Sequence, residues 1–415
     1  MKLGFFSPEV PGHLNPMLTL AGELTRRGHE TIFVGAIRGE QTVRQAGLPF
    51  HPLMPNDPRN EDLEDAFRQL ATASGMTAVA RTGKIYEIHT QMTVDEVPRV
   101  LDQLQFDGLV VDQMSPVAAS EADRRGLPYA VVCNALPVHW DAAIPPPPMA
   151  WDFRTDWLGR TRNKLFMRML ATLNDLAVWR RGLPDPMLLI REVERGVVRI
   201  AQQPAFFEYP HDTQASKLHY TAPWHRADRD DATIDFPWDW LDGRPLIYAS
   251  MGTLQNNMGY VFDAIVEAAR DLPVQVVLTQ GGGEVEVSAE IPDNVLFVRR
   301  APQLRLLEKA TLAITHAGMN TAMECLAHGV PMLCLPVTND QPGVAKRVEF
   351  HGNGRLVPVR KVTSAKLKQE LTRMLQDESF KQKASQFQAQ LAQLDGPAMA
   401  ADLIEQAIES SRKFG

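Results

Sequence analysis

Cysteine is scarce in this sequence of 415 residues. Its three cysteines, Cys133, Cys325 and Cys334, are too few and too scattered for a disulfide framework, and no C-x-x-C pair occurs, which is typical of a reducing compartment. Long apolar runs are also missing. The opening run covers only about four residues, too few for the core of a signal peptide, and no run reaches the roughly 18 residues of a membrane span. We therefore expect a cytoplasmic protein.

Positive charge is not in surplus, because 43 lysines and arginines stand against 50 aspartates and glutamates, for a formal net charge of −7. A mildly acidic chain is a poor candidate for binding nucleic acid through its phosphates, so we expect no such partner. With 44% hydrophobic and 22% charged residues, the composition excludes a disordered or fibrous protein. At roughly 100–200 residues per domain, the length predicts two or three domains.

Motifs for metals and redox cofactors are missing as well. No G-x-G-x-x-G follows an apolar run, which argues against a dinucleotide oxidoreductase, and the eleven histidines show no zinc-ligand spacing. An Asp-x-Asp motif at residues 228–230 lies in an acidic segment, where a solvated charge run is the simpler interpretation. A G-x-S-x-G motif fails around Ser250, because Tyr248 occupies its first glycine position. We therefore expect neither a metal nor a bound cofactor.

What the sequence does contain is two series of short apolar runs that alternate with helical patterns. The runs are continuously apolar, which is typical of parallel strands covered on both faces. Repeated strand–helix units of this kind predict an α/β protein with doubly wound parallel sheets. The expected strands are residues 3–7, 31–34, 109–111 and 129–133 in the first series, and residues 246–250, 274–278, 295–298, 312–315 and 332–335 in the second.

A segment rich in Asp, Trp and Pro separates the two series. We expect an N-terminal domain at residues 1–222, a linker at 223–241, a C-terminal domain at 242–395, and a last helix at 396–415 that could cross back to the N-terminal domain. Two such domains leave a cleft between them, and the ligands of these sheets bind at the carboxyl ends of the strands.

The most informative segment runs from a strand end through a tight turn at residues 315–318 into a helix. Such a turn forms an anion site, because free backbone N–H groups and the positive end of the helix dipole face the ligand. Glu324, expected on the first turn of this helix, can accept hydrogen bonds from ribose hydroxyls. Asp340 and Gln341 follow the next strand and suit sugar hydroxyls.

These residues fit a longer pattern, A-P-Q…T-H-x-G-x-N-T-x-x-E…G-x-P…P-x-x-x-D-Q, which resembles the donor-binding signature of the UDP-glycosyltransferases, glycosyltransferase family 1. The resemblance extends over nearly the whole chain, because residues 11–16 match the family's P-G-H-x-x-P loop and residues 249–253 match its S-x-G-[ST] turn. It implies the GT-B fold, in which two Rossmann-like domains face each other across a cleft. Residues 202–204 and 219–224 are similar to bacterial zeaxanthin (carotenoid) glucosyltransferases.

The resemblance implies a role for each matched residue. His316, with Gly318, Asn320 and Thr321 beside it, contacts the diphosphate; Ser250 and Thr253 touch the phosphates from the facing turn; Glu324 binds the ribose; Ala301 and Gln303 meet the uracil and ribose; Asp340 and Gln341 hold the sugar. Two positions depart from the pattern, with Arg300 in place of the usual aromatic residue and Ala317 in place of Gly or Cys. A guanidinium can stack on a base, so Arg300 leaves the nucleotide preference open, whereas we expect little consequence from Ala317.

His13 is the candidate general base. We expect Asn15 to cap the first helix and Pro16 to open it, so that the helix dipole disfavours the protonated form of His13. A neutral imidazole near pH 7 is what proton abstraction needs. In the family that this chain resembles, an aspartate partner follows a later strand, and Asp112 fits that position. Such an aspartate can orient the imidazole and stabilise the imidazolium that forms.

The resemblance implies a metal-independent enzyme that inverts the configuration of the sugar. It would move a hexose from UDP-glucose to a hydroxyl of a lipophilic acceptor such as a carotenoid, polyphenol or polyketide. Two other functions stay open: a UDP-sugar 2-epimerase on a GT-B-like fold, and a non-catalytic nucleotide-sugar-binding module. Structural roles also stay open for single residues: Asp112, Ser250 and Thr253 as turn residues, Glu324 as an ordinary helix acid, Asp340 and Gln303 as helix caps, and Arg300 as a solvated strand end.

An apolar row near residue 170 lies outside the motifs of the resemblance. It consists of Phe166, Met169, Leu170, Leu173 and Ala177 at helical spacing, with Arg160, Arg162, Lys164 and Arg168 around it. A basic amphipathic helix can rest on an anionic membrane surface, and peripheral membrane contact in the 157–181 segment is one interpretation. The other is a helix of the N-terminal domain that borders the acceptor pocket.

Overall fold

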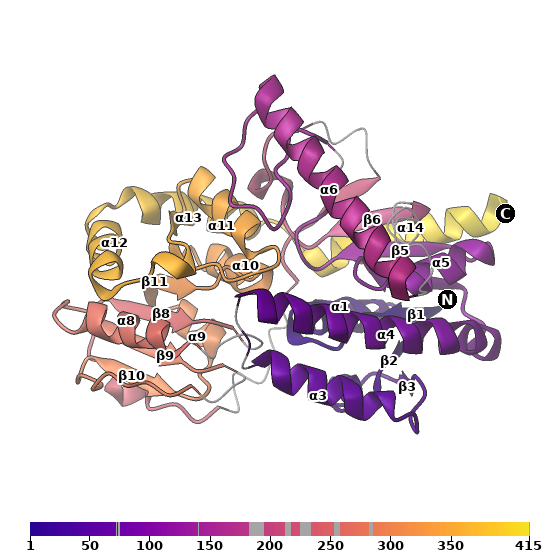
Figure 1. Ribbon diagram of the computed structural model, residues 1–415, viewed down its shortest axis with the longest axis horizontal. Coiled ribbons are helices and arrows are strands. Elements are labelled where there is room, and N and C mark those ends of the chain that lie inside the picture. The colour runs from indigo at the N-terminus through magenta and orange to yellow at the C-terminus, as the bar shows by residue number, and fades with distance from the viewer. Residues whose placement is uncertain are drawn as a thin grey trace.

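A computed structural model shows two lobes side by side, each built on a parallel sheet with helices on both of its faces (Figure 1). This architecture confirms the predicted α/β fold class. The N-terminal unit is the lobe around the first sheet, and the C-terminal unit is the lobe around the second. The structure describes residues 1–415 except 72, 74, 140, 182–194, 212–216, 225–233, 253–257, 282–284 and 415.

The sheet of the N-terminal unit has, among the described residues, seven parallel strands in the order β3-β2-β1-β4-β5-β6-β7. The order reverses between β1 and β4, so the loops that follow these two strands emerge side by side at the carboxyl edge. The strands are β1 (Lys2–Phe6), β2 (Glu30–Gly35), β3 (Phe50–Pro52), β4 (Gly108–Asp112), β5 (Tyr129–Cys133), β6 (Val198–Ala201) and β7 (Leu218–Tyr220).

The sheet of the C-terminal unit repeats this plan, with the described strands in the order β10-β9-β8-β11-β12-β13, all parallel. Its order reverses between β8 and β11, which places the turns after these two strands together. The strands are β8 (Leu246–Ser250), β9 (Gln275–Thr279), β10 (Val295–Val298), β11 (Ala310–Thr315), β12 (Met332–Cys334) and β13 (Gly354–Leu356).

Helices cover both faces of each sheet, which explains why the strand sequences are apolar without alternation. In β4, Val110 packs toward α1 and α14, whereas Leu109 and Val111 pack toward α4 and α5, and all three are fully buried. The helices are α1 (Pro11–Arg26), α2 (Glu40–Gln45), α3 (Arg59–Ala71), α4 (Gly75–Leu104), α5 (Pro116–Arg124), α6 (Trp157–Arg181), α8 (Gly259–Ala269), α9 (Gln303–Leu307), α10 (Met319–Ala327), α11 (Gln341–Phe350), α12 (Ser364–Gln376), α13 (Ser379–Leu391) and α14 (Gly396–Phe414). In the part of the chain that the structure describes, no helix is both long and apolar enough to cross a bilayer.

The first helix begins earlier than the sequence predicted. Asn15 and Pro16 were expected to be its N-cap and first residue, but α1 starts at Pro11, with the extended Val10 as its N-cap. Pro11 suits the first helical position, because its fixed φ and missing N–H cost nothing there. Pro16 therefore lies inside the helix, where it cannot donate to the carbonyl of Gly12.

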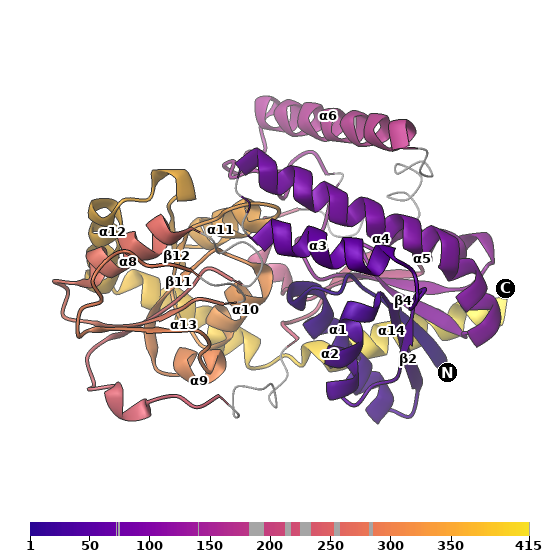
Figure 2. The same ribbon diagram turned by 60° about the horizontal axis from the view of Figure 1, so that its bottom comes forward.

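The last helix returns to the N-terminal unit, where α14 packs against α1, β5 and β6 (Figure 2). Its Ile404 and Ile408 are fully buried in the core beside α1. Arg27, the C-cap of α1, forms ion pairs with Asp402 at 2.5 Å and Glu405 at 2.8 Å. The C-terminal end of the chain therefore helps to build the N-terminal unit.

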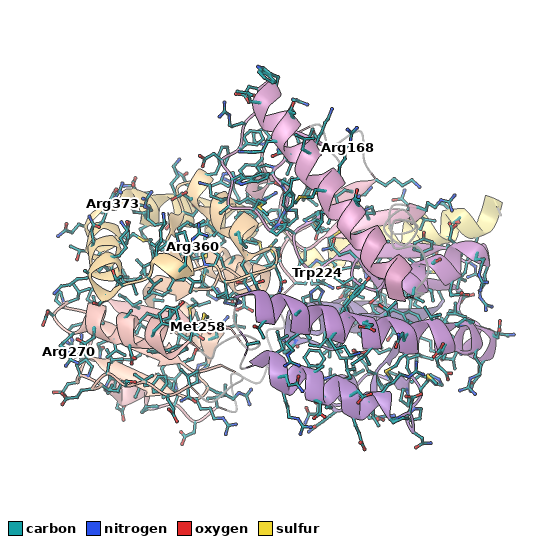
Figure 3. All side chains as sticks on the ribbon, viewed as in Figure 1. Arg168, Trp224, Met258, Arg270, Arg360 and Arg373 are labelled. Atoms are coloured by element: carbon teal, nitrogen blue, oxygen red, sulfur yellow. The ribbon has the colours of Figure 1, made fainter. Side chains whose placement is uncertain are left out.

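The chain passes between the two units at two points that touch each other. A side-chain carbon at Gly396 would lie 2.4 Å from the carbonyl oxygen of Ala222 and 2.7 Å from the ring of Trp224. Only glycine allows the two segments to approach so closely. Trp224 lies near the middle of the molecule (Figure 3) and is buried, with its Nε1 donating to Oγ1 of Thr221 at 3.1 Å.

A buried ion pair also joins the two units. Arg347 of α11 and Glu208, which follows β6, are 1% and 0% exposed, and the Arg347 Nε donates to Glu208 Oε1 at 2.7 Å. Glu208 also accepts hydrogen bonds from Gln203 Nε2 at 3.0 Å and from its neighbour's backbone, the Tyr209 N–H, at 2.9 Å. Burial alone would raise the pKa of the Glu208 carboxyl, but the charge of Arg347 holds it well below its usual range.

Candidate active site

His13 and Asp112 meet at the carboxyl edge of the first sheet. The Nδ1 atom of His13, in the first turn of α1, lies 2.8 Å from Oδ2 of Asp112 at the end of β4. The carboxylate is fully buried, whereas the imidazole is 21% exposed. Because Nδ1 is held by the carboxylate, the proton sits there in the neutral ring, and Nε2 is left as the basic nitrogen.

The carboxylate of Asp112 is itself held by two hydrogen bonds. Asn134 Nδ2 donates to Oδ2 at 2.6 Å, and the Met114 backbone N–H donates to Oδ1 at 2.7 Å. Both bonds fix the plane of the carboxylate. Asp112 is therefore positioned to orient one tautomer of His13. A residue that only formed a turn would not need this contact with the imidazole.

The pKa of His13 is raised, and this corrects the sequence argument. Burial lowers the pKa, but the charge of Asp112 and its hydrogen bond raise it, with a further contribution from the charge of Asp340. The expectation that the helix dipole would disfavour the protonated imidazole is wrong in its net effect, because the carboxylates outweigh the dipole and burial together. His13 takes up a proton more readily than an ordinary histidine.

The turn after β11 faces the turn after β8 across the imidazole of His316. Side-chain carbons at Gly252 and Gly318 would lie 2.7 Å and 2.5 Å from Nε2 of His316, so both turns need glycine to enclose the ring. Burial lowers the pKa of His316 to about 4, and a backbone hydrogen bond at Ser250 opposes this shift only in part. The ring is therefore neutral at pH 7 and can donate a hydrogen bond to an anion without carrying a charge.

Ala317, which separates His316 from Gly318, has a left-handed backbone with φ of 62° and is fully buried. We had expected little consequence from alanine at this position, but a Cβ atom in this conformation costs roughly 1–2 kcal/mol. The turn holds this conformation between β11 and α10, where the Ala317 N–H donates to Oγ1 of Thr315 at 3.2 Å, and alanine makes the turn strained.

We expect Ala317→Gly to raise the free energy of unfolding by about 0.5–1 kcal/mol, because relief of the left-handed strain exceeds the extra backbone entropy of glycine. Chemical denaturation would measure the change. Ala389→Gly, at an exposed position inside α13, is the matched control and should lower stability by about 1 kcal/mol. A loss of stability in both variants would contradict the argument for strain.

Asn320, at the second residue of α10, uses its side chain to hold the N-terminal unit. Its Nδ2 donates to the Gly12 carbonyl at 3.0 Å, and its Oδ1 accepts from Gln202 Nε2 at 2.8 Å. The Gly12 carbonyl is available because Pro16, four residues later, has no N–H to donate to it. In this structure the side-chain amide of Asn320 therefore links the N-terminus of α10 to the N-terminus of α1.

Glu324 and Gln303 form a second pair in the C-terminal unit. Gln303 Nε2 donates to Oε2 of Glu324, and Gln303 Oε1 accepts from the Tyr248 hydroxyl at 2.9 Å. The side chain of Gln303 thus does not cap α9. Glu324 is only 2% exposed and lies on the second turn of α10, not on the first as predicted, because this helix begins at Met319.

Asp340 points toward the N-terminal unit and not into its own helix. It is the N-cap of α11 by position, but its side chain makes no capping hydrogen bond, and Oδ2 accepts from the Leu136 backbone N–H at 3.0 Å. Burial raises the pKa of the Asp340 carboxyl, although that hydrogen bond and His13 oppose the shift. Gln341 accepts hydrogen bonds from the Val337 and Thr338 backbones at its Oε1, so its Nε2 is the group left to donate to a sugar.

Four of the remaining predicted residues, Ser250, Arg300, Ala301 and Thr321, lie among the described residues of the C-terminal unit. Ser250 ends β8 and is buried, with its Oγ 3.4 Å from the Gly252 N–H, whereas Thr253 lies outside the described residues. Ala301 is 9% exposed in the core beside β10, and Arg300 next to it is exposed to solvent. Thr321 lies 3.5 Å from Gln303 through its Oγ1.

Sequence reasoning missed three groups that support the site. Asn134 binds Asp112, Gln202 binds Asn320, and the Leu136 N–H binds Asp340. Asn134 and Gln202 each follow directly on a buried strand, β5 and β6. The rule that identified Asp112, a polar residue after an apolar strand, could have found both.

Comparisons with known proteins agree with this geometry. Residues 165–397, more than half of the chain, match the family described as UDP-glucoronosyl and UDP-glucosyl transferase. The chain is 28% identical to the zeaxanthin glucosyltransferase of Pantoea ananas, over 97% of this chain and 95% of that protein. It is 27% identical to the zeaxanthin glucosyltransferase of Pseudescherichia vulneris, over 98% of this chain and 97% of that protein.

The comparison of structures also finds glycosyltransferases. A solved structure of the glycosyltransferase VinC in complex with dTDP superposes with a TM-score of 0.68 at 20% sequence identity, over 99% of this chain and all of that one (100%). The two parallel sheets thus form a GT-B fold, as predicted. Together with the family match over residues 165–397, this shows that the chain belongs to the UDP-glucoronosyl and UDP-glucosyl transferase family and is a glycosyltransferase.

Proposed function

We propose that this enzyme moves glucose from UDP-glucose to a hydroxyl group of a lipophilic small molecule, with inversion at the anomeric carbon and without a metal. One observation carries the proposal: the buried carboxylate of Asp112 holds Nδ1 of His13, which leaves Nε2 as the basic nitrogen, and Asp340 reaches across from the opposite unit to the Leu136 N–H. A base on one unit and a sugar-binding carboxylate on the other suit direct displacement between two substrates.

In the proposed reaction, the proton of the acceptor hydroxyl passes to Nε2 of His13 as the acceptor oxygen forms a bond to the anomeric carbon. The bond from that carbon to the diphosphate breaks, and its electron pair leaves with UDP. Asp112 stabilises the imidazolium that forms. The N-terminus of α10 and the neutral ring of His316 stabilise the developing negative charge by hydrogen bonding.

The identities of the two substrates are supported to different degrees. Both relatives named above are zeaxanthin glucosyltransferases, which supports glucose as the sugar and a carotenoid-like hydroxyl as the acceptor. The exposed Arg300 can stack on uracil or on thymine. VinC, which has the same fold, was solved with the thymine nucleotide dTDP. We propose UDP as the nucleotide because Gln303 and Glu324 form a ready acceptor pair for a ribose.

Two alternatives are less well supported. A UDP-sugar 2-epimerase needs no acceptor, and so gives no reason for a base on the N-terminal unit. A non-catalytic module gives no reason for the buried carboxylate behind His13. The family match favours transfer over both.

The test is a reaction with UDP-glucose and a panel of hydroxylated acceptors, followed by mass spectrometry and by NMR of the anomeric proton. We expect a β-glucoside from the α-linked donor, and the same rate in excess EDTA. An α-glucoside would refute inversion, and loss of activity restored by magnesium or manganese would refute metal independence. Conversion of UDP-N-acetylglucosamine without any acceptor would favour the epimerase.

We expect Glu324→Ala to weaken UDP binding by about 1.5–3 kcal/mol, because the variant loses charge-assisted hydrogen bonds to the ribose. Titration calorimetry with UDP would measure the affinity. Glu308→Ala, an exposed carboxylate at the end of α9, is the control and should bind UDP like the native protein. If both variants bind UDP equally well, Glu324 only supports Gln303.

A further inference from the structure

The helix α6 (Trp157–Arg181) forms an outer edge of the N-terminal unit. In both ribbon views it lies along the outside of the molecule, and in Figure 2 it is the outermost helix beyond α4. Its inner side is fixed. Asn163 is 1% exposed and donates from Nδ2 to the Ala142 carbonyl at 2.9 Å, and Phe166 packs edge-on against Trp151 with ring centroids 5.4 Å apart.

The outer side of α6 exposes large apolar side chains. Leu158, Leu165 and Met169 are 50%, 60% and 51% exposed, and their spacing of seven and four residues puts them in one row along the helix. This row shares only Met169 with the predicted one, because Phe166 packs inward, Leu170 lies off the row, and the side chains of Leu173 and Ala177 are outside the described part. Trp157, at the first residue, is 73% exposed. No other large apolar side chain among those described is as exposed as this tryptophan, and a row of this kind on a soluble surface marks an interaction site.

A basic row runs beside the apolar one. Arg160, Lys164 and Arg168 follow one another at every fourth residue and are all exposed. Figure 3 labels Arg168 on this helix. From residue 157 to residue 172 the helix contains no acidic residue, although the whole chain carries a formal charge of −7. This positive, apolar surface is therefore a local feature of one helix.

We propose that the outer side of α6 binds the surface of an anionic lipid bilayer. The apolar row would enter the boundary between headgroups and acyl chains, while the basic row would lie among the lipid phosphates. Charge complementarity selects this partner, because the remaining surface of an acidic protein is repelled by the same membrane. The proposal does not depend on the identity of the acceptor, but it would bring the enzyme to the phase in which a lipophilic acceptor dissolves.

The test is co-sedimentation of the purified full-length protein with vesicles, without any substrate. We expect binding to vesicles of equal parts phosphatidylcholine and phosphatidylglycerol, and little binding to pure phosphatidylcholine. Lys164→Gln/Arg168→Gln should weaken the partition by about 20- to 30-fold, because each basic residue near an anionic surface contributes about fivefold. Leu165→Ser/Met169→Ser should weaken it by at least about tenfold.

The matched control is Arg360→Gln/Arg373→Gln, which removes two exposed arginines from the C-terminal unit, both labelled in Figure 3. This control should bind like the native protein, and all variants should keep their turnover of a water-soluble phenol. Equal binding by the control and the α6 variants, or equal binding to both kinds of vesicle, would overturn the proposal. So would a concentration-dependent dimer that the α6 variants abolish while vesicle binding is absent.

Trp157 provides an independent measurement. If the helix enters the bilayer, brominated lipids in anionic vesicles should quench part of the tryptophan emission, and Trp157→Phe should remove that part while the other six tryptophans remain. Quenching that is unchanged in this variant would mean that another surface meets the lipid, and would refute the assignment to α6.

Discussion

His13→Ala should lower the turnover of an aliphatic alcohol by roughly 10²–10⁴, which is the usual contribution of a general base. The affinity for UDP should not change, because the residues proposed to bind UDP lie in the C-terminal unit. Rates with saturating donor, together with UDP titration, would separate the two effects. The control is His219→Ala, which removes an exposed histidine of β7. Near-native turnover of His13→Ala would remove this residue from the mechanism.

Asp112 should act only through His13, so their effects should not add. The double variant His13→Ala/Asp112→Asn should resemble His13→Ala alone. Asp112→Asn alone should also lower the pKa of His13, because the carboxylate charge raises that pKa against the effect of burial. The acid limb of the rate profile should therefore move to lower pH, with a smaller maximum rate. A double variant with the full product of both losses would contradict the assignment.

Arg347→Met should destabilise the protein by about 3–5 kcal/mol, because it leaves the carboxylate of Glu208 buried without its countercharge. Chemical denaturation would measure the loss. Lys368→Met is the control, since Lys368 pairs at 2.8 Å with an Asp271 that is 70% exposed, and such a surface pair contributes about 0–1 kcal/mol.

The double variant Arg347→Met/Glu208→Gln should recover much of this loss, because no buried charge is left unpaired. The pair also depends on pH. The pKa of Glu208 is lowered on folding, so the stabilisation is present above its unfolded value of about 4.5 and is lost as the pH falls toward the folded value. If Arg347→Met costs no more than Lys368→Met, the pair does not hold the two units together.

The strands could be predicted wherever burial on both faces made the sequence continuously apolar. Three of the expected strands, at residues 129–133, 246–250 and 295–298, agree with the structure at both ends. The short strands β3, β6, β7 and β13 were missed, because a histidine or arginine interrupts the apolar run of each, whereas the equally short β10 and β12 are apolar throughout. The start of α1 was misjudged because Pro11 and Pro16 offer the same signal, and only the tertiary structure selects the first.

The site residues could be predicted where the side chain itself has a chemical role, and not where its role depends on contacts between the two units. His13 and Asp112 were paired from spacing and resemblance, and the structure brings them to 2.8 Å. The role of Asn320 could not be predicted in this way, because the hydrogen bonds of its side chain to Gly12 and Gln202 depend on how the two units dock. Roles that depend on the donor sugar nucleotide remain predictions.

The return of α14 means that the N-terminal unit is discontinuous in sequence, with the C-terminal unit inserted into it. A hybrid enzyme made by exchanging everything after the first crossing would place a foreign last helix over α1, where Ile404 and Ile408 now fill the core. The sound graft is an internal cassette with junctions at the two adjacent segments, beside Ala222 and before Gly396. Cut in this way, the C-terminal unit could be replaced as a single insert, and the N-terminal unit would keep its own last helix.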